Sequence, residues 1–205
     1  AAGSTRAASW VTSRAMDVFD AVRLRRSMKP EAMRPEPIPR ETVERLLDAA
    51  NWAPSHGLTE PWRFIVFTGA AKRDLGEALL AGSTGGETVS EGDPRRAKIM
   101  KKVETAPVVV ALICAPSQAS NIFEHEEIAS VAMAVQNLHL CARALGLAAF
   151  WSSGKKAFSA EVARFLELEP PQRCLGVLYL GYPAGEWPTS TRGPVSEKVT
   201  WRDGA

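Results

Sequence analysis

The sequence lacks the short signatures of the common catalytic classes. It contains no Gly-x-Ser-x-Gly, His-Glu-x-x-His, Cys-x-x-Cys or Walker A pattern, which mark several hydrolases, metal or dithiol sites and P-loop proteins. The glycine-rich stretch 82–92 also lacks the Gly-x-Gly-x-x-Gly spacing of a dinucleotide-binding turn. His125 and His139 are fourteen residues apart on one predicted helix, too far to share a metal ion. We therefore expect no metal site, and any catalysis would depend on a bound cofactor.

Cysteine, net charge and long apolar runs are also scarce. The three cysteines, Cys114, Cys141 and Cys174, are odd in number and lie in apolar sequence, which favours reduced, buried thiols in a cytoplasmic protein. A net charge of +2 predicts no general attraction to nucleic acid or to an anionic membrane. No apolar run approaches the roughly 18 residues that a membrane-spanning helix needs.

The length of 205 residues predicts one domain, with or without extensions, and 45% hydrophobic residues are ordinary for a globular protein. Residues 1–15 differ from the rest, because they are rich in serine and alanine, contain Arg6 and Arg14, and have no acid. A transit-type presequence fits this composition, and so does a processed end, an added leader or a start at Met16. We expect a leader or disordered extension over 1–15 and a folded domain over 16–205.

Hydrophobic periodicity predicts alternating helices and strands. Helices are expected over 17–26, 40–52, 70–80, 95–102, 123–145 and 159–166. Strands are expected over 62–67, 107–114, 148–151 and 174–180. The remaining long segments are predicted to be an extended linker with four prolines at 30–39, a polar loop at 82–92, and an irregular tail at 183–205 that wraps against some surface.

The helix predicted over 123–145 is apolar around nearly its whole circumference. Such a helix must be buried on several sides. In a chain of this size, that pattern favours a central helix that could be shared with a second subunit. His125 is expected in solvent, and His139 is expected to be an interior histidine with its hydrogen bonds satisfied.

Arg25, Arg26 and Ser27 form a compact set of hydrogen-bond donors at the end of the first predicted helix. Two planar guanidiniums and a hydroxyl are well suited to holding a phosphate. About thirty residues later, Ala53-Pro54-Ser55-His56 ends the second helix in a turn, because the residue before proline is disfavoured in a helix. The simpler alternative for the arginines is an exposed pair beside an ordinary loop.

Four segments in this order resemble the nitroreductase family of FMN-dependent oxidoreductases, and its compact single-domain subfamily in particular. They are Arg-Arg-Ser at 25–27, Pro-Ile-Pro at 37–39 followed by LLDAANWAPS, FWSSG at 150–154, and GYPAGEWPTSTRGPV at 181–195. The resemblance extends from Met16 to Pro194. Each segment alone is a weak signal, but their joint order is specific.

The resemblance implies an α+β fold in which a central mixed sheet is flanked by helices. It also implies an intertwined homodimer that binds two FMN molecules at its interface. Arg25, Arg26 and Ser27 would hold the phosphate and ribityl hydroxyls of one FMN, and Arg192 would add charge from the tail.

The rest of the implied site surrounds the flavin ring. Trp151, Ser152 and Ser153 would pack near the isoalloxazine, with backbone amides close to N5 or O4. His56 would reach the FMN of the other subunit.

At three positions this sequence has a residue that differs from the one common in the family. Leu58 stands where many members have an asparagine that bonds the flavin edge. Trp52 stands where relatives often have arginine, so a second contact there is in doubt. Lys29 resembles the basic residue after the Arg-Arg-Ser segment, although relatives often have arginine.

The implied activity is hydride transfer from NAD(P)H through flavin N5 to a nitroaromatic, a quinone or an activated alkene. A specialised relative that degrades flavin, deiodinates or dehydrogenates is an alternative. A flavin-binding or redox-sensing module with little turnover, or an α/β domain without flavin, are others.

Overall fold

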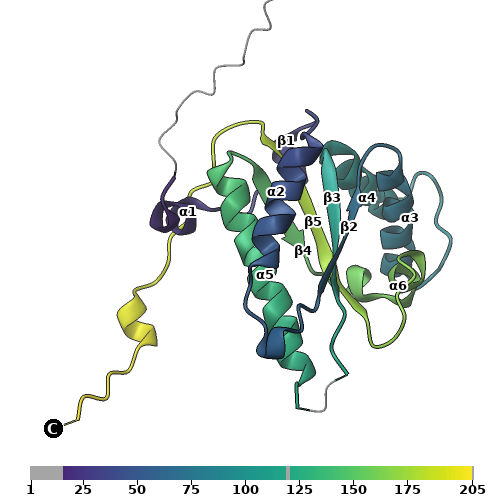
Figure 1. Cartoon of the computed structure of the whole chain (residues 1–205). Helices are drawn as coiled ribbons and strands as arrows, with labels where there is room; N and C mark the ends of the chain where they lie inside the picture. Colours follow the sequence, from purple (N-terminus) through teal and green to yellow (C-terminus); the bar gives the residue numbers. More distant parts are fainter. Residues whose placement is uncertain (1–15, 119–120, 205) are drawn as a thin grey trace, which may run out of the picture.

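The computed structural model, which describes residues 16–118 and 121–204, has a central sheet between two layers of helices (Figure 1). The expected leader, 1–15, lies outside the described residues. The strands are β1 (Met33–Arg34), β2 (Trp62–Phe67), β3 (Val108–Cys114), β4 (Ala148–Ser152) and β5 (Arg173–Pro183). β5 pairs with β3 on one side and with β4 and then β1 on the other, and β2 pairs with β3. All of these pairings are antiparallel, and the parallel element is an isolated bridge between Ser27 and Ala149.

Helices cover both faces of this sheet. The α-helices are α1 (Val18–Leu24), α2 (Arg40–Asn51), α3 (Ala71–Thr84), α4 (Pro94–Thr105), α5 (Glu124–Ala144) and α6 (Ala160–Phe165). The short 3-10 helices are η1 (Pro30–Ala32), η2 (His56–Leu58), η3 (Lys155–Phe158) and η4 (Val195–Lys198). α2 and α5 lie on one face, and α3, α4 and α6 lie on the other (Figure 1). The predicted α+β class is confirmed.

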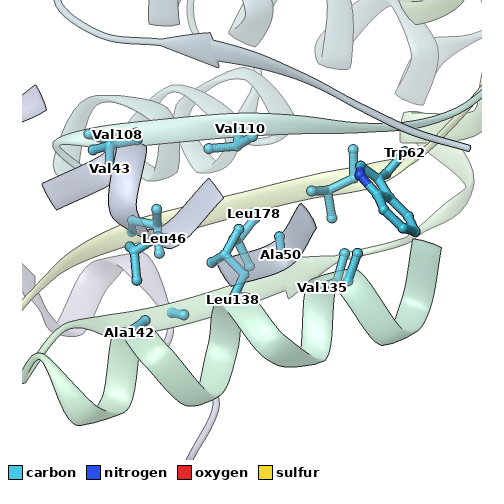
Figure 2. Close-up of a cluster of buried hydrophobic side chains, with 14 of the residues drawn as sticks. Val43, Leu46, Ala50, Trp62, Val108, Val110, Val135, Leu138, Ala142 and Leu178 are labelled. Atoms are coloured by element: carbon cyan, nitrogen blue, oxygen red, sulfur yellow. The ribbon is translucent and has the colours of Figure 1, made fainter. Parts of the chain in front are cut away.

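The core between α2, α5 and the sheet holds the long helix in place (Figure 2). Leu46 of α2 and Leu138 of α5 are fully buried there, and they meet Leu178 of β5. β3 is buried on both faces because its side chains alternate between this core and the core under α3 and α4. The expectation of a covered central strand at 107–114 is therefore confirmed.

A bulge in β5 shapes the end of β4. The β3–β5 register shifts at Leu112/Ile113, and the indole Nε1 of Trp151 donates to the carbonyl of Leu175, 3.2 Å away. Gly176 has a φ of +133°, and a Cβ there would lie 2.5 Å from Trp151 Nε1 and 2.6 Å from Ser152 O. A residue without a side chain is thus required for Trp151 and Ser152 to lie against β5.

The prediction of an extended linker over 30–39 is wrong for the first half of this segment. Pro30 begins η1, where its missing N–H costs no helical hydrogen bond, and Met33–Arg34 pair with Tyr182–Pro183. Met33 is buried in the core under α3 and α4. The proline pattern did not reveal these tertiary contacts.

Several other boundaries differ from the predictions, including those of α3 and α1. α3 continues through residues 82–84 of the predicted loop and ends at Gly85, whose left-handed conformation terminates it. Gly82 is a close-contact position, because a Cβ there would lie 2.6 Å from the carbonyl oxygen of Lys156. α1 is shorter than the predicted 17–26, since Arg25 is already extended.

The tail after Pro183 is irregular, as predicted, apart from the short η4. All of its described residues except Trp187 are exposed, and it projects away from the body of the chain with α1 near its base (Figure 1). Among the described residues, no helix is long and apolar enough to cross a membrane.

Candidate functional site

The Arg25–Ser27 segment lies beside the outer edge of β4. α1 begins at an Asp17 cap, whose carboxylate accepts from the backbone N–H of Asp20, and the helix ends where Arg25 turns to an extended conformation. Met28 N then donates to Ala149 O at 3.1 Å, and Ser27 forms the parallel bridge to Ala149. The end of α1 is thereby attached to the strand that carries Trp151 and Ser152.

Positively charged residues converge at this position. Arg26 contacts the backbone carbonyl of Ser190 in the tail at 3.5 Å, and Arg192 donates to the side chain of that serine and to the carbonyl of Thr191. Burial lowers the pKa of Arg25, and the charges of Arg192 and Arg26 lower it further. The structure thus brings Arg25, Arg26 and Arg192 together from segments far apart in the sequence.

No carboxylate neutralises this cluster within the described residues. The ion pairs of the described chain include none of Arg25, Arg26 and Arg192, and they do not include the neighbouring Arg143 of α5. The Nε of Arg26 is also buried without a hydrogen-bond partner there. Clustered cations and an unsatisfied donor are costly unless an anion completes them. A phosphate is the ligand that this donor set fits best.

β4 provides a second surface next to the arginines. Trp151 and Ser152 are partly exposed, and Ser153 and Gly154 are exposed directly after the strand. The carbonyl of Leu175 holds the Trp151 indole, as described above. This surface and the arginine segment are adjacent because Ser27 and Met28 are attached to Ala149 of the same strand.

His139 borders the cluster from α5. It is interior, as predicted, but its Nδ1 has no hydrogen-bond partner among the described residues, so the expectation of a fully satisfied histidine is wrong. Burial, with a contribution from Arg25, lowers the pKa of His139 to about 4. At neutral pH this ring is uncharged and adds no further positive charge.

His56 is not part of this cluster in its own chain. Its Nδ1 lies 3.1 Å from Glu126 Oε1 in the first turn of α5, whereas Arg143 lies in the last turn. Glu126 and Arg143 are seventeen positions apart, which corresponds to about 26 Å along a helix. Figure 1 shows the turn that follows α2 at one end of α5 and α1 near the other.

The turn that carries His56 is firmly attached to α5. Thr59 Oγ1 donates to Glu127 Oε2 at 2.7 Å, and the other oxygen of this buried carboxylate accepts from Ser117 N at 2.8 Å. Trp52, by contrast, is 80% exposed at the end of α2, and a contact from it to a cofactor stays a prediction. Leu58 is exposed too, as is Lys29.

Sequence reasoning missed Arg143 and Trp187. Near the end of α5, Arg143 resembles an ordinary C-terminal cation that stabilises a helix dipole. Its guanidinium carbon lies 4.0 Å from the ring centroid of Trp187, a contact that no local pattern indicates. Only the fold brings the helix end and the tail together.

The chain is thus an α+β protein whose helix-flanked antiparallel sheet carries, at the β4 edge, a cluster of arginines that no described carboxylate neutralises. Residues 22–182 match the nitroreductase family, and the chain belongs to it. YfhC of Bacillus subtilis, named provisionally as an NAD(P)H nitroreductase, is 28% identical over 88% of this chain and 92% of its own. The 5,6-dimethylbenzimidazole synthase of Rhodospirillum rubrum is 31% identical over 82% of both chains. A nitroreductase-type protein of Desulfovibrio desulfuricans, crystallised with FMN, has a TM-score of 0.69 and 26% identity, covering 92% of this chain and 98% of its own.

The pH dependence of stability tests the environment of His139. Because its pKa is about 4 in the folded protein and 6.5 ordinarily, the unfolded chain takes up a proton first as the pH falls. We expect the free energy of unfolding to lose about 3 kcal/mol from this group between pH 6.5 and pH 4, and nothing above pH 7. Urea titrations across this range should show a shallower pH dependence in His139→Gln.

His125→Gln is the matched control, since His125 is exposed on the same helix. It should leave the pH dependence unchanged. Equal slopes for the wild type and His139→Gln would show that His139 titrates normally.

Proposed function

We propose that this protein is an FMN-dependent oxidoreductase that passes hydride from NAD(P)H to a nitroaromatic, a quinone or an activated alkene. The observation that carries the proposal is the convergence of Arg25, Arg26 and Arg192, with no carboxylate among their described partners, beside the end of β4. The FMN complex of the D. desulfuricans relative supports the choice of phosphate-bearing cofactor.

The residues present fit FMN in two parts. Arg25, Arg26 and Arg192 would hold the phosphate, which would also satisfy the free Nε of Arg26. Ser27 would bond a ribityl hydroxyl from its place beside Ala149. When bound, FMN supplies the hydride-transfer chemistry, and the protein binds and orients it.

The remaining ring contacts would come from the end of β4. Trp151 is fixed by its hydrogen bond to Leu175, and Ser152 and Ser153 present backbone and hydroxyl groups beside it. These groups would orient the isoalloxazine and exclude water from one side of it. We assign no acid–base side chain to the reaction.

A homodimer would complete the surfaces that a single chain leaves open. α1 exposes Val18, Phe19 and Val22 at 63%, 72% and 53%, and only its Ala21 is buried. On α5, Ala129 and Met133 form an exposed strip along one side of the helix. Apolar surface of this extent is typical of a protein–protein interface.

The tail needs a second chain for the same reason. Val195, Val199 and Trp201 are 73%, 42% and 80% exposed, although they are apolar. The outer edge of β2 has no partner strand among the described residues. An open cavity of about 670 Å³, lined by residues such as Val43 and Val66, lies beside this strand. We propose that the tail of one chain wraps the other, which gives the intertwined dimer its form.

His56 would then contribute to the site in the partner chain. It lies at the opposite end of α5 from the arginines of its own chain. Two chains that pack through α5 in opposite directions would place His56 of one subunit near Arg25 of the other. The hydrogen bond to Glu126 would leave Nε2 of His56 free to contact FMN.

The free thiols fit a reducing compartment, and we propose a cytoplasmic location. Cys114, Cys141 and Cys174 form no disulfide. Burial raises the pKa of Cys114 to about 11, with Glu127 contributing, so this thiol stays protonated and unreactive.

A specialised activity that degrades flavin, deiodinates or dehydrogenates is the second candidate function. It is favoured by the R. rubrum relative, which is named as a synthase and not as a reductase. A flavin-binding module with little turnover is the non-catalytic alternative. Oxidation of NADH or NADPH with a quinone acceptor by the FMN-loaded protein separates reductase activity from both.

Replacing Arg25 tests the cofactor assignment. Arg25→Ala should raise the dissociation constant for FMN by about 10- to 100-fold, since a charge-assisted hydrogen bond contributes about 1.5–3 kcal/mol. Fluorescence titration of the apoprotein measures this constant. The activity with NAD(P)H and a quinone should return when FMN is added in excess.

Arg23→Ala is the matched control, because Arg23 is exposed on α1 two residues earlier. It should bind FMN as the wild type does. Unchanged affinity in Arg25→Ala would remove that residue from the site, and a colourless wild type that FMN cannot reconstitute would overturn the proposal.

Mixed dimers test the contribution of His56 across the interface. Neither His56→Ala nor Arg25→Ala homodimers should bind FMN well. If the two residues come from different chains, a heterodimer of these variants has one intact site and one doubly damaged site. We expect it to recover up to half of the FMN binding of the wild type, measured after subunit exchange.

Differently tagged subunits allow the heterodimer to be isolated and its exchange to be demonstrated. No recovery in a verified heterodimer of two clearly defective parents would place His56 and Arg25 in the same site of one chain, or His56 outside it.

A further inference from the structure

Arg143 connects three segments that meet at the cationic site. Its Nε donates to the carbonyl of Leu24 at 3.2 Å, and its guanidinium stacks on the ring of Trp187, with 4.0 Å from the guanidinium carbon to the ring centroid. Arg143 itself lies in the last turn of α5. One side chain thus joins the end of α1, the end of the long helix and the start of the tail.

The two contacts of Arg143 lie within five residues of the phosphate-binding residues of the proposed site. Leu24 precedes Arg25, and Trp187 precedes Arg192 by five residues in a tail that is otherwise exposed. Trp187 is the one described tail residue beyond Pro183 that is partly buried. Its contact with Arg143 therefore limits where the tail, and Arg192 with it, can lie.

The charge of Arg143 makes its location informative. Burial lowers its pKa, and the nearby charge of Arg26 lowers it further, while no ion pair of the described chain neutralises it. A cation beside another cation is unfavourable in the absence of an anion. A guanidinium can stack on an indole and donate to a carbonyl simultaneously, which a lysine ammonium does less well.

We propose that Arg143 is a positioning residue, which acts through Trp187 and the Leu24 carbonyl to hold Arg192 and Arg25–Arg26 around a single phosphate. This inference rests on the proposed function, because the phosphate is that of FMN. Arg143 would not touch the phosphate itself. Its effect on FMN binding would pass through the tail and the end of α1.

A double-mutant cycle tests this role. Arg143→Met and Trp187→Leu should each raise the dissociation constant for FMN about 10-fold, and the double variant should be no weaker than the worse single variant, because both changes break one link. Trp187→Phe keeps an aromatic face and should retain most of the affinity. At saturating FMN, kcat with NAD(P)H and a quinone should stay at the wild-type value in all variants.

Arg164→Met is the control, since Arg164 is an exposed arginine on α6. It should bind FMN normally. Thermal unfolding of the apoproteins provides the second readout: loss of FMN affinity without a matching loss of thermal stability supports positioning, and a parallel loss of both overturns it in favour of a general structural role.

Two other results would overturn the positioning role of Arg143 and leave the proposed function intact. If Trp187→Leu binds FMN normally and Arg143→Met does not, the effect of Arg143 on FMN binding does not pass through Trp187 and the tail. If both bind FMN normally while Arg25→Ala does not, the proposed function stands and the positioning role fails. A wild type that binds no FMN would instead remove the proposed function on which the inference rests.

Discussion

Repulsion between guanidiniums that no described carboxylate neutralises is the constraint around which this structure is organised. Arg25 and Arg26 are held at one place by the attachment of Ser27 and Met28 to β4, and Arg192 is brought there by the tail. Burial lowers the pKa of Arg25, and the charges of Arg192 and Arg26 lower it further. This clustering of cations is unfavourable alone and would become favourable if a dianionic phosphate were bound there.

The rest of the fold makes that arrangement rigid. β5 runs through the middle of the sheet, and its bulge at Gly176 allows the end of β4 to pack closely against it. α5 is clamped to the sheet by the core that it shares with α2, so its two ends are fixed points. The arginines lie at one end and the His56 turn lies at the other. A single chain separates these two groups, and an antiparallel pair of chains would bring them together.

Periodicity predicted the buried parts of the fold and failed where tertiary contacts decide. The strand at 107–114 and the helix at 123–145 follow from apolar patterning alone, and both are confirmed. β1 was missed because two residues in a proline-rich stretch carry no strand pattern, and their pairing depends on the end of β5. Gly82 resembled a loop glycine, whereas it lies inside α3 against the backbone of Lys156.

The candidate site was predictable to a similar degree. Arg25, Arg26 and Ser27 stand out as a local donor set, and the order of segments pointed to Arg192 and to Trp151–Ser153. No local sequence pattern identifies Arg143, because its contacts come from α1 and the tail. That His139 Nδ1 has no hydrogen-bond partner among the described residues is visible only in the packed structure. Residue types indicate the chemistry of a site, but the charges that surround it depend on the fold.

Comparing FMN with riboflavin tests the central claim most directly, since the two ligands differ only in the phosphate. Titration of the apoprotein with each, at low and at high salt, gives the contribution of the arginines without any mutation. We expect FMN to bind at least about 100-fold more tightly than riboflavin at low salt, from charge-assisted bonds of about 1.5–3 kcal/mol each, and the difference to shrink as salt increases. Equal affinity for the two ligands, independent of salt, would contradict a phosphate site at Arg25, Arg26 and Arg192.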